Sequence, residues 1–435
     1  MRHPNVTAAV LILISISSSA IGFLTSILIA RWLGVAGFQE YSVAVAAFLL
    51  FATIGELGIG KYALRIVPEY RENQDWGLFR GFHYFGVTAV ALAGIVLAVT
   101  LFTLDLTWPD LFKNPSVGLA AVFIPVSALV ATAAELVIAN EMAISGVLLT
   151  RLICPLLMLG ALAWIALTGE LTASSAILSF GLSGLVGLGV AGLLVWRATR
   201  GLGRKSSLQF HIQSWLRYSI VYWVFAFLTS WIFRISLLVL QSTDVSELEV
   251  ARFAAALEVA MLVLIVAKST NKFYQPQLAR IMTSGDWMEA LRLRRSRRIL
   301  IGCACLAYLL IVLLFGRMIL GWFGPEYPGG YYTLCWLTLG TAVTTIFSMA
   351  PEYLKFSDRM GTLLLVYFAA GVGILILTSV LAPRYGATGA GCALSLVLIG
   401  TTLTFDRLAT RHLFHRASFQ RAAAAEANHS DASAD

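Results

Sequence analysis

The sequence predicts an all-α integral membrane protein with about twelve transmembrane helices in two six-helix lobes. Of its 435 residues, 59% are hydrophobic and 12% are charged, and the mean hydropathy is +0.82. Soluble domains contain about 25% charged residues, so this composition excludes an ordinary globular protein. Apolar runs of roughly 20 residues, enough to cross the hydrocarbon core as a helix, recur with short connections. We therefore expect no separate soluble domain.

The apolar runs define the expected spans in chain order. They cover residues 6–30, 41–66, 82–104, 117–138, 147–168, 173–196, 218–240, 250–270, 299–320, 331–354, 361–382 and 386–405. The first run is too long for the apolar part of a cleaved signal peptide, so we expect it to remain as the first helix.

A polar linker at residues 201–217 separates the two expected lobes. The N-terminal lobe then comprises residues 1–200 and the C-terminal lobe residues 218–406. A faint repeat supports the division, because residues 40–70 and 249–279 both run from a Glu through an apolar span to a basic, proline-containing exit. Both copies run in the same direction, as parallel repeats do. The small, polar tail at residues 407–435 is predicted to be cytoplasmic and disordered.

The positive charges indicate how the chain lies in the membrane. If the N-terminus is cytoplasmic, most of the 31 Lys and Arg residues fall on the cytoplasmic side. The exceptions are Arg31, Lys113, Arg234, Arg252, Arg317 and Arg384. The positive-inside rule therefore predicts that both termini are cytoplasmic, and it explains the net charge of +8 without nucleic acid as a partner.

Two kinds of bound group are not expected. The stretch GELGIGKY at residues 55–62 resembles a phosphate-binding loop, but Tyr62 replaces the magnesium-binding hydroxyl and the glycines lie in an apolar span. The cysteines lie in apolar runs without C-x-x-C spacing, and His412 and His415 have no third ligand nearby. We predict neither a metal nor a cofactor. The expected outer loops are short, which also disfavours a catalytic site.

Charged residues inside the spans are the best candidates for function, because each costs at least about 2.5 kcal/mol at the bilayer centre. Arg234 shares a helical face with Trp223, Phe227 and Ser230. Glu258, on the next span, could pair with Arg234, or the two could border a cavity; the sequence is compatible with both.

Two further groups of charges lie in the N-terminal lobe and near the inner boundary. Lys61 and Arg65 are four residues apart, so they share a face that an anion would stabilise. Glu56 lies on another face and is a candidate proton or cation site. For Lys61, Arg65 and Lys268, snorkelling to lipid headgroups is an equally good interpretation.

Four stretches resemble the polysaccharide flippases of the multidrug/oligosaccharidyl-lipid/polysaccharide exporter superfamily. They are residues 30–70, 273–286, 323–360 and 381–399, in the order in which that family has them. The resemblance implies two lobes around a central cavity that opens alternately to each side. It implies a bacterial inner-membrane protein that moves polyprenyl-diphosphate-linked oligosaccharide to the outer leaflet, for O-antigen, capsule or exopolysaccharide assembly. A polymerase and glycosyltransferases would be its partners.

The resemblance also implies roles for particular residues. Basic residues of the first two and of the seventh and eighth spans would bind the diphosphate; here they are Arg31, Lys61, Arg65, Arg234 and Lys268. Glu56 and Glu258 would couple transport to an ion gradient. Two alternatives remain open: a drug or small-metabolite/cation antiporter of the same superfamily, and a non-transporting scaffold of a polysaccharide assembly complex.

Overall fold

The computed structural model describes residues 4–108, 114, 116–202, 206–284, 287–355 and 360–432. The first half contains α1 (Pro4–Gly55), α2 (Ile59–Glu72), α3 (Trp76–Thr107), α4 (Val117–Ala121), α5 (Ile124–Ala139), α6 (Ala143–Leu148), the π-helical turn η1 (Leu149–Ile153), α7 (Cys154–Thr168) and α8 (Ala173–Thr199). The second contains α9 (Ile212–Ser242), α10 (Glu247–Met261), α11 (Leu264–Ser284), α12 (Trp287–Gly321), the 3₁₀ turn η2 (Tyr327–Gly330), α13 (Tyr331–Ile346), α14 (Ala350–Lys355) and α15 (Met360–Ala432).

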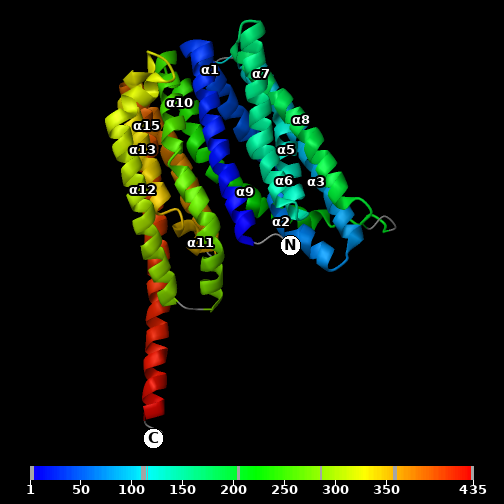
Figure 1. Cartoon of the computed structure of the whole chain (residues 1–435), viewed down its shortest axis with the longest axis vertical. Helices are drawn as coiled ribbons and strands as arrows, with labels where there is room; N and C mark the ends of the chain where they lie inside the picture. Colours follow the sequence, from blue (N-terminus) through cyan, green and yellow to red (C-terminus); the bar gives the residue numbers. More distant parts are fainter. Residues whose placement is uncertain are drawn as a thin grey trace.

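The all-α membrane fold is confirmed. Nine helical stretches in the described part of the chain are long and apolar enough to cross a membrane. Two of them each contain two spans, separated by turns at Gly34 (φ 67°) and Gly386 (φ 56°), where only glycine adopts the backbone without strain. The pair α13 and α14 adds a further span. About twelve segments therefore cross the bundle side by side (Figure 1).

Several predicted spans are broken rather than continuous. The span expected at residues 41–66 ends as α1 at Gly55 and resumes as α2 at Ile59. Gly58 has φ 68°, and a Cβ there would lie 2.4 Å from the Ser219 carbonyl oxygen of α9. Gly58 of GELGIGKY is thus a close-packing position, and it lies in the break between α1 and α2. Similar breaks separate α4 from α5, α10 from α11 and α13 from α14.

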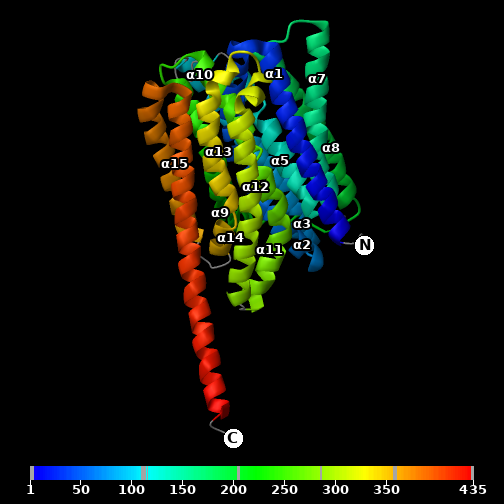
Figure 2. The ribbon, with the colours of Figure 1, turned by 60° about the vertical axis from the view of Figure 1, so that its left-hand side comes forward.

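The segment between α8 and α9 packs against the start of α3. The Gln209 backbone N–H donates to the Gly77 carbonyl (3.2 Å), and Arg80 Nη1 donates to the Ser206 carbonyl (3.0 Å). At the other end of the chain, α15 continues as a helix through the predicted tail to Ala432 (Figure 2). The side chains beyond Arg411 lie outside the described residues.

The two lobes share their largest apolar core at one end of the bundle. At the far end, which carries the Gly34 and Gly386 turns, buried apolar residues of α1, α9, α10, α12 and α15 form one shared core. At the near end, where α1 and α9 begin, the described residues form two separate cores, one containing Tyr70 and Trp215 and the other Tyr353. Between the lobes, α1 packs against α9, α10 and α11, and α2 against α9.

Candidate functional site

Arg234 lies in the middle of α9 with most of its hydrogen-bonding capacity unused. Its Nε donates to Ser230 Oγ (3.1 Å), which is the only hydrogen bond that it makes among the described residues. Ser230 in turn lies 3.5 Å from Thr53 Oγ1 of the N-terminal lobe. The side chain is only half-buried. The remaining guanidinium N–H groups, which form a planar fork suited to phosphate, are therefore available to a ligand.

Glu258 provides a negative charge on the neighbouring helix. Its neighbours Leu257 and Val259 are buried, whereas Glu258 itself is exposed although it lies well inside the span. It interacts electrostatically with Arg234 of α9, and also with Tyr41 of α1. Within the described residues the two charges do not approach to salt-bridge distance. Glu258 is therefore accessible within its span instead of closing a tight pair with Arg234.

Glu56 extends this row of charges into the N-terminal lobe. It lies in the break between α1 and α2 and interacts electrostatically with Arg234, Lys61 and Glu135. Trp223 of α9 holds the break in place, because its Nε1–H donates to the Ile54 carbonyl (3.0 Å). Breaks of this kind are tolerated in a membrane where they border a cavity or are buried in protein. The break thus positions the Glu56 carboxylate near Lys61, Glu135 and Arg234.

Lys61 forms an ion pair with Glu135 of α5. The exposed fraction of the Lys61 side chain is 46% and that of Glu135 is 19%. The sequence did not reveal this partner, because the two residues are 74 positions apart and no local pattern connects them. The pair leaves Lys61 accessible from the near end of the bundle.

The other predicted site residues lie apart from Arg234. Arg65 is exposed on α2, one turn beyond Lys61. Arg31 lies at the far end, where its Nε donates to the Trp322 carbonyl (2.7 Å) and joins the lobes. Lys268 belongs to α11, but its side chain lies outside the described residues. The structure therefore brings Glu56, Lys61, Arg234 and Glu258 into one charged row.

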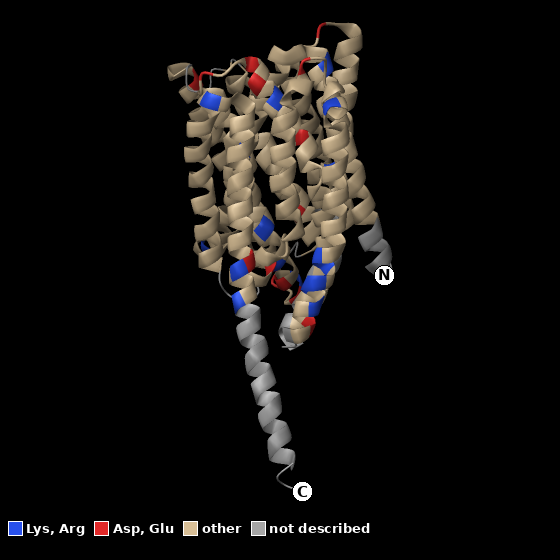
Figure 3. Cartoon of the chain, turned by 90° about the vertical axis from the view of Figure 1, so that its left-hand side faces the viewer, with Lys and Arg blue, Asp and Glu red and all other residues tan. Residues whose placement is uncertain are grey.

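Charge is otherwise sparse between the two ends of the bundle (Figure 3). At the near end, Arg294 and Arg297 have exposed fractions of 7% and 2%. Both belong to α12, and their side chains are buried in the C-terminal lobe. Arg294 Nη2 bonds Asp406 Oδ1 (2.6 Å), and Arg297 Nη2 bonds Ser348 Oγ (2.8 Å). These arginines serve the fold of that lobe.

No group of three or more potential metal ligands occurs in the part of the chain that the structure describes. The charged row consists of two carboxylates, one guanidinium and one ammonium on four different segments. Such a row can bind an anion through its basic members and can bind or release protons or cations at its carboxylates.

Comparison with known proteins identifies both a family and a fold. A family model described as "Polysaccharide biosynthesis protein" matches residues 7–282. No curated protein matches the sequence. An inward-facing multidrug resistance MATE family transporter of the MOP superfamily has a similar fold, with a TM-score of 0.68, 13% identity, and coverage of 94% of this chain and 98% of that one.

Two further solved structures agree on the fold. The lipid II flippase MurJ in an inward closed conformation has a TM-score of 0.67 at 14% identity, covering 93% of this chain and 89% of that one. An outward-facing MATE transporter has a TM-score of 0.65 at 11% identity, covering 94% and 96%. The fold therefore occurs in both a lipid flippase and drug transporters.

Proposed function

The chain belongs to this family of polysaccharide biosynthesis proteins, and we propose that it moves polyprenyl-diphosphate-linked oligosaccharide from the cytoplasmic to the outer leaflet of a bacterial inner membrane. The cargo would serve O-antigen, capsule or exopolysaccharide assembly, next to a polymerase and glycosyltransferases. Transport rather than catalysis suits a chain without a sizeable extramembrane domain among its described residues. In this proposal both termini lie in the cytoplasm, as the positive-inside rule predicts.

The observation that carries the proposal is the guanidinium of Arg234. It lies inside a span, half-buried, with one hydrogen bond to Ser230 and its other donors unused. A permanent charge inside a span costs free energy, and charges that are kept there usually have a function. A diphosphate would accept charge-assisted hydrogen bonds from the guanidinium.

In the proposed transport cycle the two lobes move relative to each other. The shared core at the far end holds the lobes together there, whereas at the near end α9 is the element that joins them, because its Trp215 packs into the core of α2 and α3. Lys61 and Arg65, exposed on α2, would meet the diphosphate first, and Arg234 would hold it between the lobes. Opening of the far end would then release the cargo outward, with the prenyl chain remaining in the bilayer.

The test is cargo movement in vesicles reconstituted with purified protein. Arg234→Ala should lower the rate of flipping of a fluorescent polyprenyl-diphosphate-linked oligosaccharide by at least about tenfold, because charged hydrogen bonds contribute about 1.5–3 kcal/mol. Arg317→Ala is the matched control, since Arg317 is exposed on α12 and stacks on Tyr331 at 5.3 Å. Equal flipping by both variants would remove Arg234 from the proposed site.

A drug exporter of the same fold is the second candidate, favoured by the MATE structures. Efflux of a cationic dye by the wild-type protein, with no flipping of any lipid-linked glycan, would establish that alternative. Inactivity towards both cargoes would favour a scaffold. Depletion in cells adds a check, because loss of a flippase traps lipid-linked oligosaccharide on the cytoplasmic leaflet.

Coupling to an ion gradient is assigned to Glu56 and Glu258. Each is a carboxylate in the charged row, where protonation or cation binding would change its interaction with Arg234. Glu56→Gln and Glu258→Gln should each reduce the dependence of flipping on an imposed ion gradient. Unchanged gradient dependence in both variants would reject coupling through them.

A further inference from the structure

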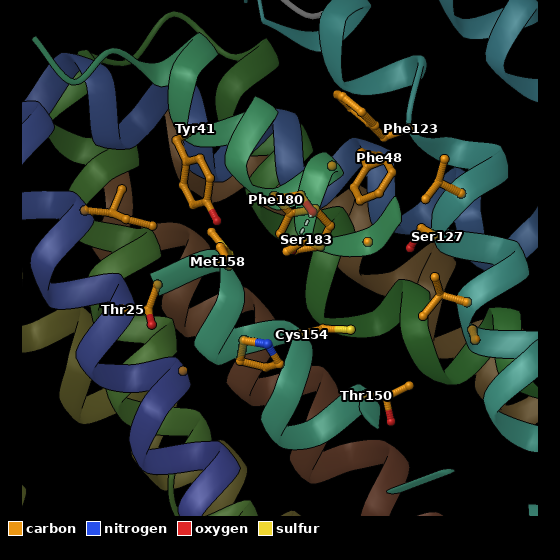
Figure 4. Close-up of a pocket in the computed structure, with 18 of the residues that line it drawn as sticks. Thr25, Tyr41, Phe48, Phe123, Ser127, Thr150, Cys154, Met158, Phe180 and Ser183 are labelled. Carbon is orange, nitrogen blue, oxygen red and sulfur yellow. Dashed lines mark hydrogen bonds between the residues drawn. The ribbon is translucent and has the colours of Figure 1, made fainter. Parts of the chain in front are cut away.

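The N-terminal lobe contains a cavity of about 370 Å³ apart from the charged row. Its walls come from α1, α5, the η1 and α7 segment, and α8. Figure 4 shows Thr25, Phe48, Cys154, Met158 and Phe180 around the open space. This volume falls within the range of ligand sites, roughly 300–1,000 Å³.

The cavity wall is uncharged, and most of the residues that line it are apolar. No Asp, Glu, Lys, Arg or His is among the described residues that line it. The hydroxyls of Thr25, Thr150 and Ser183 donate to carbonyls of their own helices, at 2.8, 3.3 and 2.7 Å. Apolar cavities take up apolar molecules rather than water. The lining therefore suits a hydrocarbon and disfavours a cation.

The wall is shaped by an irregular turn. The π-helical turn η1 interrupts the fifth span between α6 and α7, and both Thr150 within it and Cys154 after it line the cavity. Such turns are rare in helices and often occur at functional sites. The flexible Met158 on α7 can adapt its shape to an irregular apolar ligand.

Tyr41 connects the cavity to the charged row. Its side chain lines the cavity, and its hydroxyl points into the open space towards Met158 (Figure 4). The same residue interacts electrostatically with Glu258, which interacts with Arg234. A molecule with a diphosphate at Arg234 therefore has an apolar compartment next to its head group.

We propose that this cavity binds the prenyl chain of the cargo, over the isoprene units nearest to the diphosphate. The inference rests on the proposed function and adds a chain-binding compartment to it. The shared ligand chemistry is a hydrocarbon chain, which a bilayer phospholipid could also supply. The proximity of Tyr41 to the charged row favours the cargo chain, since a phospholipid has no reason to place its chain beside Arg234.

Photo-crosslinking in nanodiscs tests the proposal. The probe is a polyprenyl diphosphate without sugar that carries a diazirine in an isoprene unit near the diphosphate. Labelled peptides, located by mass spectrometry, should come from residues 123–131, 150–158 and 180–184. Unlabelled polyprenyl diphosphate should compete, whereas inorganic diphosphate at the same concentration should compete poorly.

Two substitutions fill the cavity, and a third is their control. Gly22 lines the cavity, and a Cβ there meets no atom within 4 Å, so Gly22→Leu adds bulk without a clash at Cβ. Ser127→Leu fills the opposite wall from α5. Each should lower labelling by about tenfold, because methylene groups of the chain lose their site. Gly189→Leu, at an exposed glycine of α8 outside the cavity, should label like the wild type.

Three results would overturn the proposal: labelling confined to other segments, full labelling of the folded Gly22→Leu variant, or labelling by a diazirine phospholipid that polyprenyl diphosphate does not displace. The wild-type labelling map decides the question even if both cavity variants fail to fold. If the wild-type protein flips lipid-linked oligosaccharide but its cavity is not labelled, the cavity proposal is rejected and the proposed function stands. If the cavity is labelled but the protein flips no lipid-linked oligosaccharide, the proposed flippase function is rejected.

Discussion

The two lobes have a similar frame but different interiors. In the N-terminal lobe, the first, second, fourth, fifth and sixth spans line the uncharged cavity of about 370 Å³. In the C-terminal lobe, the seventh, tenth, eleventh and twelfth spans enclose a cavity of about 160 Å³, which Phe233, Phe347 and Tyr367 narrow. Four equivalent spans, counted within each lobe, thus line both cavities, and the second span adds Tyr41 and Phe48 to the larger one only.

The common frame is visible at the far end of both lobes. Near the start of the second span, the Glu40 carbonyl accepts from Asn114 Nδ2 (2.8 Å) and holds the connection between the third and fourth spans. Near the start of the eighth span, Arg252 Nε donates to the Glu326 carbonyl (2.9 Å) and holds the connection between the ninth and tenth. The parallel repeat suggested by the sequence is consistent with these anchors.

The difference lies in what the charges do at the near end. In the C-terminal lobe, Arg294 and Arg298 both bind Asp406, and Arg297 is fully buried. In the N-terminal lobe, Lys61 is paired but accessible. The comparison suggests that the near-end charges of the C-terminal lobe stabilise its fold, whereas Lys61 in the N-terminal lobe remains available to cargo.

The largest expected effect comes from Asp406→Asn. Asp406 neutralises Arg294 and Arg298, and its side chain is only 16% exposed. Removing one member of a buried pair costs about 3–5 kcal/mol, because the other charge remains buried without a counterion. The unfolding temperature of the purified protein, measured in one detergent, should therefore fall by several degrees.

Glu170→Gln is the control for this prediction, since Glu170 is exposed in the connection between α7 and α8. It should leave the unfolding temperature unchanged. If Asp406→Asn and Glu170→Gln behave alike, the charges of the C-terminal lobe do not stabilise it, and the contrast between the lobes is lost.

A smaller effect is expected from the Lys61 and Glu135 pair. Partly exposed ion pairs contribute about 0–1 kcal/mol, so Lys61→Ala and Glu135→Gln should leave the unfolding temperature nearly unchanged. Lys61→Ala should nevertheless slow flipping of the lipid-linked oligosaccharide by about threefold to tenfold, because a basic contact to the diphosphate is lost.

The double variant distinguishes a cargo contact from a counterion role. If Lys61 meets the cargo, Lys61→Ala should slow flipping equally in the wild type and in Glu135→Gln. Recovery of the rate in the double variant would show that Lys61 acts only through Glu135. The N-terminal charges would then be structural, like those of the other lobe.

The sequence predicted the architecture well because the transfer of apolar helices into the bilayer dominates the free energy of this fold. Burying helices in hydrocarbon requires long apolar runs, and each predicted span has a counterpart in the structure. The same term singled out Arg234 and Glu258, since a charge inside a span is costly enough to stand out. The two turns near Gly34 and Gly386 also fall between predicted spans or at their boundary.

Features that depend on contacts between distant segments could not be predicted. The ion pair of Lys61 with Glu135 joins positions 74 residues apart, and the break at Gly58 is fixed by the approach of α9. The cavity arises from the packing of several spans whose residues are individually ordinary. Hydropathy measures transfer into lipid and does not report which apolar faces leave space between them.

The smallest expected effect concerns Arg31, at the joint between the lobes. Its Nε donates to the Trp322 carbonyl at 2.7 Å, but the side chain is exposed, so water competes for the bond. Next to it, Phe23 and Phe38 pack against Phe323 with ring centroids 5.9 and 6.1 Å apart. Arg31→Gln should therefore increase the population of the far-end-open form only about twofold to fivefold.

Spin labels at Ala36 and Pro325, two exposed positions on either side of the joint, would report this population as a long-distance component in pulsed electron paramagnetic resonance. Arg31→Lys keeps a cationic donor and should shift the distribution less than Arg31→Gln. Identical distributions in Arg31→Gln and the wild type would show that the aromatic contacts alone hold the far end closed. In that case Phe38→Ala should increase the population of the far-end-open form, although Arg31→Gln does not.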